Sequence, residues 1–255
     1  VYKRQAIYQV FSSVEQLATM LQSKNETERK AKEFLKDTIS DISHQLKTPL
    51  AALAMYQEII ESEPENAETV KQFAAKMGIS LKRMEQLILS MLKITRLDTG
   101  NIIFEKKSCR VSELIAHSVN ELTARAKNEN KQIQIDGGGE QKLICDMEWT
   151  GEAIGNIVKN ALDHTQVGGI VRITWNRAPA MFQIFISDNG SGIAPEDIHH
   201  IFKRFYRSKH SIDTQGIGLG LPLAKSIIEG QGGVISVQSE SGKGTLFTLS
   251  FLTEL

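Results

Sequence analysis

Apolar residues recur at heptad spacing between residues 34 and 61, in two interleaved series. One series is Ile39, Leu46, Leu53 and Ile60; the other is Leu35, Ile42 and Tyr56, with Pro49 in the remaining turn. Two interleaved seven-residue series predict a helix that buries a narrow seam against other helices. With Ile39 at position a, His44 falls at position f, so we expect its imidazole to face solvent, away from the seam.

A second helix is expected to begin near Ala67, after the breaker at 62–66, and to end at 96–101. Its heptad positions hold Val70, Met77, Met84 and Met91 in one series and Phe73, Leu87 and Ile94 in the other, with Ser80 as the polar interruption. Two antiparallel helices bury only part of these seams. We therefore predict that residues 34–97 pair with a second copy as a four-helix bundle.

Residues 1–33 are polar and helix-prone, and we expect a connecting helix there that leads into the domain at 34–100. Beyond residue 100, short strand-like runs alternate with amphipathic stretches at 112–128, 147–165 and 221–230. The expected strands are Ile102–Glu105, Ile133–Ile135, Leu143–Cys145, Ile170–Trp175, Phe182–Ser187, Val234–Ser239 and Thr245–Phe251. The predicted fold class is thus α plus α/β: a helical hairpin followed, in residues 101–255, by an α/β sandwich with helices on one face of a mixed sheet.

Composition narrows the classes of partner. Thirty basic and thirty acidic residues leave no net charge, which gives no general electrostatic support for a nucleic-acid or anionic-membrane partner. The sequence holds no apolar run of about 18 residues that would span a bilayer. Cys109 and Cys145 are far apart in sequence, in no metal-ligand or redox spacing, and are predicted to be free thiols in a reducing compartment. Because the chain begins at Val1, we expect a piece of a longer protein.

Two segments of the second half suit a nucleotide. Asn156 and Asn160 are four residues apart on an expected helix, so both amides project from one face, where their oxygens suit Mg²⁺. The segment Asp188-Asn189-Gly190-Ser191-Gly192-Ile193 directly follows an expected strand. Its aspartate offers an acceptor to the exocyclic amine of adenine, and its glycines allow close approach of the backbone. An ordinary Asx-Gly turn is the alternative.

A glycine-rich segment, Gly216-Ile217-Gly218-Leu219-Gly220-Leu221-Pro222, opens into the expected helix at 221–230. Glycines before a helix N-terminus expose backbone N–H groups and the positive end of the helix dipole, which suits a polyphosphate. The segment lacks the Gly-Lys-Ser/Thr ending of a Walker A loop. Finally, Gly242-Lys243-Gly244-Thr245 joins two expected strands, and the Thr245 hydroxyl is available to donate to adenine or to a bridging water.

These segments together resemble one family. Ser43-His44-Gln45-Leu46-Lys47-Thr48-Pro49-Leu50 resembles the phosphoacceptor box of bacterial sensor histidine kinases. The four nucleotide segments are similar to the N, G1, G2 and G3 boxes of the GHKL-type ATP-binding fold that histidine kinases share with DNA gyrase-type and mismatch-repair ATPases. Ile201–Arg207 resembles the F box of the kinases. The resemblance covers residues 34–97 and 146–251, and it implies a Bergerat-type catalytic domain and ATP with Mg²⁺ as cofactors.

The resemblance also implies roles for individual residues. His44 would accept the γ-phosphoryl group, Gln45 would orient its ring, and Thr48 would position the water that dephosphorylates a response regulator. The implied nucleotide-binding residues are Asn156, Lys159, Asn160, His164, Asp188, Gly190, Gly192, Ile193, Tyr206, Arg207, Lys209, Gln215, Gly216, Ile217, Gly218, Leu219, Gly220 and Thr245, with Asn160 also at the metal. Residues 194–221 would form a lid.

Two positions depart from the family's pattern. Gln45 stands where related kinases often carry Glu or Asp, and Asp163-His164 stands where they often carry a basic and then an aromatic residue. The first departure predicts a slower autokinase, since an amide cannot take up a proton. The second puts a carboxylate near the phosphates, or turns it outward.

The function expected from this resemblance is that of a dimeric sensor histidine kinase that phosphorylates His44 and passes the phosphoryl group to an aspartate of a response regulator receiver domain. This chain would be the cytoplasmic portion of a membrane-anchored protein whose sensor region it lacks. Two other classes are considered. A gyrase-type ATPase would not need the solvent-facing His44, and an ATP-binding scaffold would not need its intact asparagines and glycines.

Overall fold

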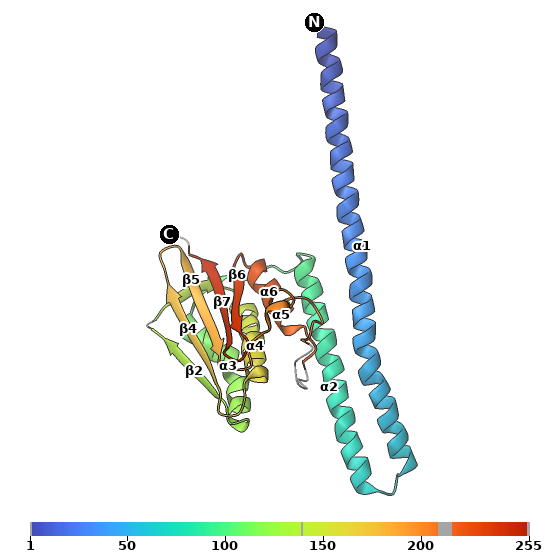
Figure 1. Ribbon diagram of the computed structural model, residues 1–255, viewed down its shortest axis with the longest axis vertical. Coiled ribbons are helices and arrows are strands. Elements are labelled where there is room, and N and C mark those ends of the chain that lie inside the picture. Colours follow the sequence, from blue (N-terminus) through green and yellow to red (C-terminus); the bar gives the residue numbers. More distant parts are fainter. Residues whose placement is uncertain (1, 139, 209–215, 254–255) are drawn as a thin grey trace. The chain divides into compact units, whose positions relative to one another are not determined.

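The computed structural model describes residues 2–138, 140–208 and 216–253 (Figure 1). The chain folds as two compact units, Val1–Met84 and Glu85–Leu255. The helices are α1 (Tyr2–Ser62), α2 (Ala67–Asp98), α3 (Val111–Asn128), α4 (Met147–His164), α5 (Pro195–Ile198) and α6 (Gly220–Gly230). The strands are β1 (Lys107–Arg110), β2 (Gln132–Gly137), β3 (Lys142–Cys145), β4 (Ile170–Arg177), β5 (Met181–Asp188), β6 (Val234–Glu240) and β7 (Gly244–Leu252).

The first unit is a helical hairpin. The breaker works as the sequence predicts, because the Asn66 side chain accepts the N–H of Thr69 and so caps the start of α2. Across the hairpin, the rings of Tyr56 and Phe73 lie 5.6 Å apart. The segment at 1–33, where a connecting helix is expected, leads directly into the first long helix, since α1 runs without a break from Tyr2 to Ser62. Pro49 lies inside α1 and is buried.

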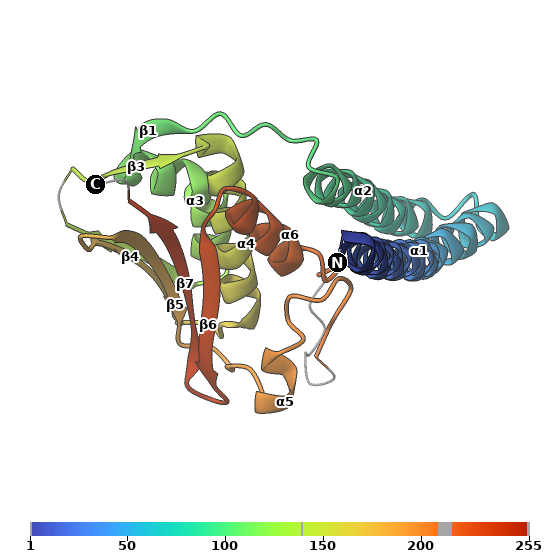
Figure 2. The same cartoon turned by 90° about the horizontal axis from the view of Figure 1, so that it is seen from above.

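The second unit is built on a five-stranded sheet in the order β2-β4-β5-β7-β6, in which only β2 and β4 are parallel. Figure 2 shows α3, α4 and α6 on one face of this sheet. Alternate residues of β5 point into the space between the sheet and these helices. The core side chains there include Ile154, Ile157, Leu162, Ile173, Phe182, Ile184, Ile186, Ile227, Phe247 and Leu249. Each such side chain contributes roughly 1.5–3 kcal/mol through burial. The predicted fold class is therefore confirmed for the hairpin and for the α/β sandwich.

The strand predicted at Ile102–Glu105 is wrong. Ile103 is 91% exposed there, and the Phe104 ring packs edge-on against Trp149, with 6.1 Å between centroids. The backbone N–H of Glu105 is taken by the Asp146 carboxylate instead of a neighbouring strand. The strand lies further along at Lys107–Arg110, where it pairs antiparallel with β3 in a separate two-stranded sheet.

None of the helices that the structure describes combines the length and the hydrophobicity of a membrane-crossing segment.

Candidate functional site

The His44 imidazole is exposed on α1, as the heptad pattern predicts. Thr48, one turn later, is also exposed, whereas Gln45 is half-buried and Pro49 is buried. Pro49 has no N–H, so the carbonyl of Gln45 receives no helical hydrogen bond from it. The segment therefore presents an accessible imidazole on a helix whose hydrogen-bond ladder is interrupted next to it.

Helix α4 carries the predicted asparagines of the second unit. It begins where Asp146 accepts the N–H of Trp149, a side-chain N-cap that fixes the first turn. Asn156 and Asn160 are half-buried on one face, and Lys159 between them is exposed. The Asn156 amide donates to the carbonyl of Glu152, which leaves its oxygen available. A Cβ at Gly220 would lie 3.1 Å from that oxygen, so Asn156 faces the start of α6.

Asp188 ends β5 at the rim of a cavity. It accepts the N–H of Gly190 at 2.9 Å and is bonded by the backbone of Thr245, its register partner on β7. Burial raises the pKa of Asp188, and these backbone bonds partly offset that effect. Gly190 is required by space, because a Cβ would lie 2.4 Å from the carbonyl oxygen of His164. This contact holds the Asp188 loop against the end of α4.

The Thr245 hydroxyl belongs to a hydrogen-bonded group behind Asp188. It lies 3.0 Å from the hydroxyl of Ser239, which accepts the N–H of Ile193 and donates to the carbonyl of Gly244. Ser239 thereby joins β6, β7 and the loop after β5. Sequence reasoning missed Ser239, since a serine on an alternating strand gives no signal of its own.

The glycine segment enters α6 in a conformation that favours glycine. Gly218 has φ +74°, and its carbonyl accepts the N–H of Phe205 at 2.9 Å. No side-chain hydrogen bond caps the start of α6 at Leu219. Its first N–H groups are therefore available to an anion at the positive end of the helix dipole.

These elements enclose a cavity of about 290 Å³. The predicted residues that line it are Asn160, His164, Asp188, Gly192, Ile193, Tyr206, Arg207, Gly216, Gly218 and Thr245. A second cavity adjoins the first, sharing Asn160 and Asp163 with it, and is lined by the predicted residues Asn156, Lys159, Ile217, Leu219 and Gly220. Gly190 shapes the loop without lining either cavity. Lys209 and Gln215, also predicted, lie outside the described residues.

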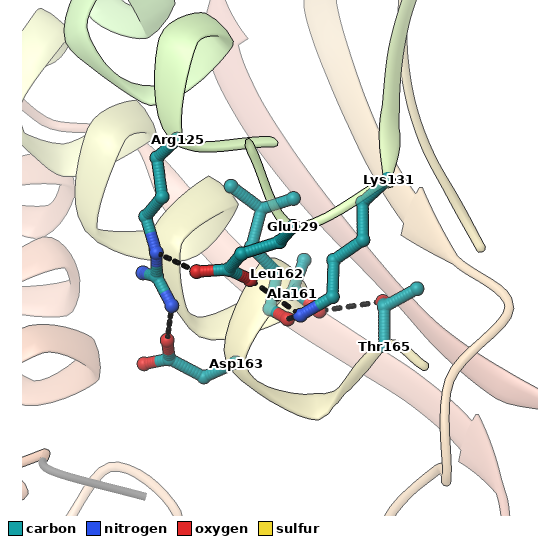
Figure 3. Close-up of polar contacts among 7 residues, drawn as sticks. All are labelled: Arg125, Glu129, Lys131, Ala161, Leu162, Asp163 and Thr165. Carbon is teal, nitrogen blue, oxygen red and sulfur yellow. Dashed lines mark hydrogen bonds and ion pairs between the residues drawn. The ribbon is translucent and has the colours of Figure 1, made fainter. Parts of the chain in front are cut away.

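Asp163 lines both cavities, and its carboxylate is held by Arg125 of α3 at 2.6 Å (Figure 3). Arg125 also donates to Glu129 at 2.6 Å, and Lys131 donates to Glu129 and to the carbonyl of Leu162. Burial alone would lower the pKa of Arg125, but its bonds to Asp163 and Glu129 outweigh burial and raise it. Asp163, which departs from the family's pattern, is thus paired within the second unit: the Arg125 guanidinium balances the charge of its carboxylate beside the cavities.

The part of the lid segment before residue 209 is held by contacts of three residues, Tyr206, His200 and Arg204. The Tyr206 hydroxyl donates to Asp197, which raises the pKa of Tyr206, and the ring of Tyr206 lies 5.4 Å from that of His200. Arg204 binds the carboxylate of Asp98 at the end of α2. The second cavity is also lined by Gln86 and Ser90 of α2, which sequence reasoning did not connect with the nucleotide.

The α/β sandwich with these two cavities defines a nucleotide-binding domain of the class shared by histidine kinases and gyrase-type ATPases. Comparison with known families agrees. Residues 34–100 match the His Kinase A (phospho-acceptor) domain, and residues 145–255 match the histidine kinase-, DNA gyrase B- and HSP90-like ATPase family. Both matched domains, in this order, show that the chain belongs to the sensor histidine kinases, as its sequence motifs predicted.

Relatives and solved structures are of the same kind. The chain is 30% identical over 217 residues to the sensor-like histidine kinase SenX3 of Mycobacterium tuberculosis, a match that covers 84% of this chain and 53% of SenX3. It is also 30% identical over 217 residues to the sensor protein SrrB of Staphylococcus aureus, covering 84% of this chain and 37% of SrrB. The chain therefore spans about half or less of the length of these relatives.

Two solved structures share the fold. The Acinetobacter baumannii histidine kinase AdeS superposes with a TM-score of 0.67 at 18% identity, covering 82% of this chain and 97% of AdeS. The histidine kinase ThkA, in its complex with the response regulator protein TrrA, superposes with a TM-score of 0.72 at 20% identity, covering 91% of this chain and 66% of ThkA.

Proposed function

We propose that the chain is an ATP-dependent protein-histidine kinase that transfers the γ-phosphoryl group of ATP to His44. The observation that carries this proposal is the coincidence of two features: an exposed histidine on the hairpin, and a second unit whose two adjoining cavities are lined by the predicted nucleotide-binding residues. In the reaction, a nitrogen of His44 forms a bond to phosphorus while the bond to the bridging oxygen breaks, and ADP leaves.

The nucleotide would occupy both cavities. Adenine would lie in the first, where Asp188 accepts a hydrogen bond from its exocyclic amine and Thr245 lies behind. The phosphates would extend into the second, toward the free N–H groups at the start of α6 and Lys159. Tyr206 and Arg207 line the first cavity from the lid, and His164 closes its base. A site of this form supplies positioning and charge neutralisation, which phosphoryl transfer chiefly requires.

Mg²⁺ fits this site as a partner of the phosphates. The described residues hold no group of three or more His, Cys, Asp and Glu side chains arranged for a metal ion. The Asn160 amide oxygen, with Asn156 beside it, is of the hard-oxygen type that Mg²⁺ accepts, and the ion commonly takes its other ligands from phosphates and water. The bound ion would neutralise charge on the β- and γ-phosphates. The pairing of Asp163 with Arg125 keeps that carboxylate from competing for it.

A homodimer through residues 34–97 is part of the proposal. Large apolar side chains of the hairpin remain exposed in the single chain, with Ile39 55%, Met55 51% and Leu81 56% exposed. Such a concentration of exposed apolar surface on a long helical hairpin supports burial against a second copy as a four-helix bundle. The domain limits at 34–100 and 101–255 belong to the same proposal.

The phosphoryl group would then pass from His44 to an aspartate of a response regulator receiver domain docked on the hairpin. Dephosphorylation of that regulator, with Thr48 orienting the attacking water, completes the proposed cycle. Thr48 is exposed one helical turn from His44, which supports this role. The sensor and membrane attachment of the whole protein are likewise proposals, because the matched relatives extend well beyond the part shared with this chain.

The test is incubation of the chain with γ-labelled ATP, followed by assay for acid-labile, alkali-stable label. His44→Gln should abolish the label while ATP binding survives, and His117→Gln, an exposed histidine of α3, is the matched control that should keep it. Asn160→Asp should lose both label and Mg²⁺-dependent ATP affinity while the dimer persists. Label that remains in His44→Gln would refute the assignment of the acceptor.

A further inference from the structure

Cys109 of β1 and Cys145 of β3 lie together, although 36 residues separate them in sequence. Their sulfur atoms are 3.4 Å apart, both thiols are free, and the antiparallel register pairs Cys109 with Leu143 and Lys107 with Cys145, so the two cysteines are diagonal neighbours. A disulfide needs about 2.05 Å between sulfurs. The sulfurs must therefore approach by about 1.35 Å. β1 and β3 form a small sheet separate from the main one.

The two thiols differ in access and in acidity. Both cysteines line a surface groove of about 780 Å³ together with Arg110 and Lys142, but Cys109 is half-buried whereas Cys145 is only 1% exposed. The contact between the two sulfurs lowers the pKa of Cys109 to about 7, while the same contact and burial raise the pKa of Cys145. Cys109 is thus the thiol that meets a solute, and Cys145 is the thiol that waits behind it.

We propose that Cys109 and Cys145 form a reversible disulfide in response to small-molecule disulfides in solution. Formation of this disulfide would alter the hydrogen bonds of Glu105, in the segment between α2 and β1, and of the start of α4. The Cys109 thiolate attacks one sulfur of a small disulfide; the mixed disulfide forms and one small thiolate leaves with the electron pair. Cys145 loses its proton to water and attacks the Cys109 sulfur, and the second small thiolate leaves. Two protein thiols are oxidised, and one small disulfide is reduced to two thiols.

Cys145 lies next to a group of hydrogen bonds through which formation of the disulfide would affect the rest of the second unit. Cys145 contacts the hydroxyl of Thr150 and directly precedes Asp146, the cap of α4. Asp146 accepts the backbone N–H of Glu105 at 2.9 Å. The Gln231 side chain accepts the N–H of Asp146 at 2.7 Å and donates to Thr150 at 2.9 Å. A shift of the Cys145 sulfur toward Cys109 removes its contact with Thr150 and alters this group of bonds at once.

The closure should leave the nucleotide cavities largely intact. Asn160 is 13 residues beyond Met147, the first residue of α4 and two residues after Cys145, which is about 20 Å at about 1.5 Å per residue. We therefore expect ATP affinity to change less than about threefold on oxidation, whereas the amides of Glu105 and Trp149, which donate to Asp146, should exchange with solvent deuterium at an altered rate. The disulfide itself is independent of the proposed kinase activity.

The test is to titrate the chain with mixtures of oxidised and reduced glutathione, then trap the thiols by alkylation. The wild type should lose both thiols within one chain, with a mass decrease of about 2 Da, and recover them on reduction. Cys145→Ser should stop at a glutathione adduct on Cys109. In the wild type, the reaction of Cys109 should speed up as pH rises through about 7. Cys109→Ser should stay unmodified.

Three outcomes would overturn the proposal. The first is two reduced thiols at full oxidant. The second is a disulfide between chains. The third is glutathione addition to Cys145 in Cys109→Ser at the rate seen for Cys109. A disulfide that forms but leaves exchange at Glu105 and Trp149 unchanged would refute the transmission to the linker and α4.

Discussion

Arg125→Met should weaken both the fold and ATP binding, for separable reasons. The guanidinium makes two charge-assisted bonds of 2.6 Å, to Asp163 and to Glu129, and its side chain is 34% exposed while that of Asp163 is 19% exposed. Methionine keeps most of the aliphatic stem and removes the charge. Hydrogen bonds to charged groups contribute about 1.5–3 kcal/mol each when buried, and exposure reduces this. We expect a loss of about 2 kcal/mol in the free energy of unfolding.

The effect on ATP follows from the carboxylate left behind. Asp163 lines both cavities, so without Arg125 its negative charge faces the phosphates. At about 8 Å and an effective dielectric constant of about 40, the repulsion is about 1 kcal/mol per unit of phosphate charge. Each unit of phosphate charge should therefore raise the dissociation constant of ATP about fivefold. In Arg125→Met/Asp163→Asn, that carboxylate is absent, and affinity should return to within about threefold of the wild type while the loss of stability remains.

Calorimetric titration with ATP–Mg²⁺ and urea unfolding measure the two effects on the same samples. Arg172→Met is the matched control, since Arg172 and Asp136 form an exposed pair at 3.6 Å, and both quantities should stay near their wild-type values. The reasoning fails if Arg125→Met binds ATP as the wild type does. It fails equally if the double variant binds as weakly as Arg125→Met, because the carboxylate would then not be the cause.

Four further predictions follow from single residues. Gln45→Glu should speed single-turnover phosphorylation of His44 and Gln45→Ala should slow it; equal rates across pH 6–9 would remove Gln45 from catalysis. Thr48→Ala should lose regulator dephosphorylation and keep autophosphorylation, whereas equal loss of both would indicate helix damage. Asp188→Asn should weaken ATP binding about 10–100-fold and abolish preference for ATP over inosine triphosphate; a retained preference contradicts the adenine contact. The pKa of Glu129 is lowered from its ordinary value of 4.5, chiefly by the hydrogen bond from Lys131. The Glu129 carboxylate should therefore stabilise the fold at pH values above 4.5. The difference in Tm between wild type and Glu129→Gln should therefore shrink as pH falls below that value.

The sequence was sufficient for features that local pattern controls. The heptads of 34–61 predicted both the helix and the exposure of His44, and the i, i+4 spacing of Asn156 and Asn160 predicted their shared face on α4. Glycine-rich segments were equally informative, because a positive φ as at Gly218 restricts the choice of residue.

Features that depend on distant partners escaped prediction. Lys107–Arg110 has no apolar pattern typical of a strand and is a strand because β3 pairs with it. Ile102–Glu105 has a short apolar run but no partner strand. The Arg125–Asp163 bond joins residues 38 apart, and the sulfur contact joins residues 36 apart. No periodicity within one element encodes such pairs. From the sequence, Asp163 was therefore only a departure from the family's pattern, and nothing indicated that the two cysteines lie side by side.

Pro49 has a mechanical consequence for the phosphoacceptor. A helix resists bending through its ladder of hydrogen bonds, and α1 lacks one rung at the Gln45 carbonyl, in the turn that carries His44. Bending at this turn has one backbone hydrogen bond fewer to strain, so α1 is more compliant there than in an uninterrupted turn. A change in the bend re-aims the His44 imidazole while the residues on either side stay helical. In the proposed phosphotransfer cycle, such compliance would let His44 change its direction without unfolding α1.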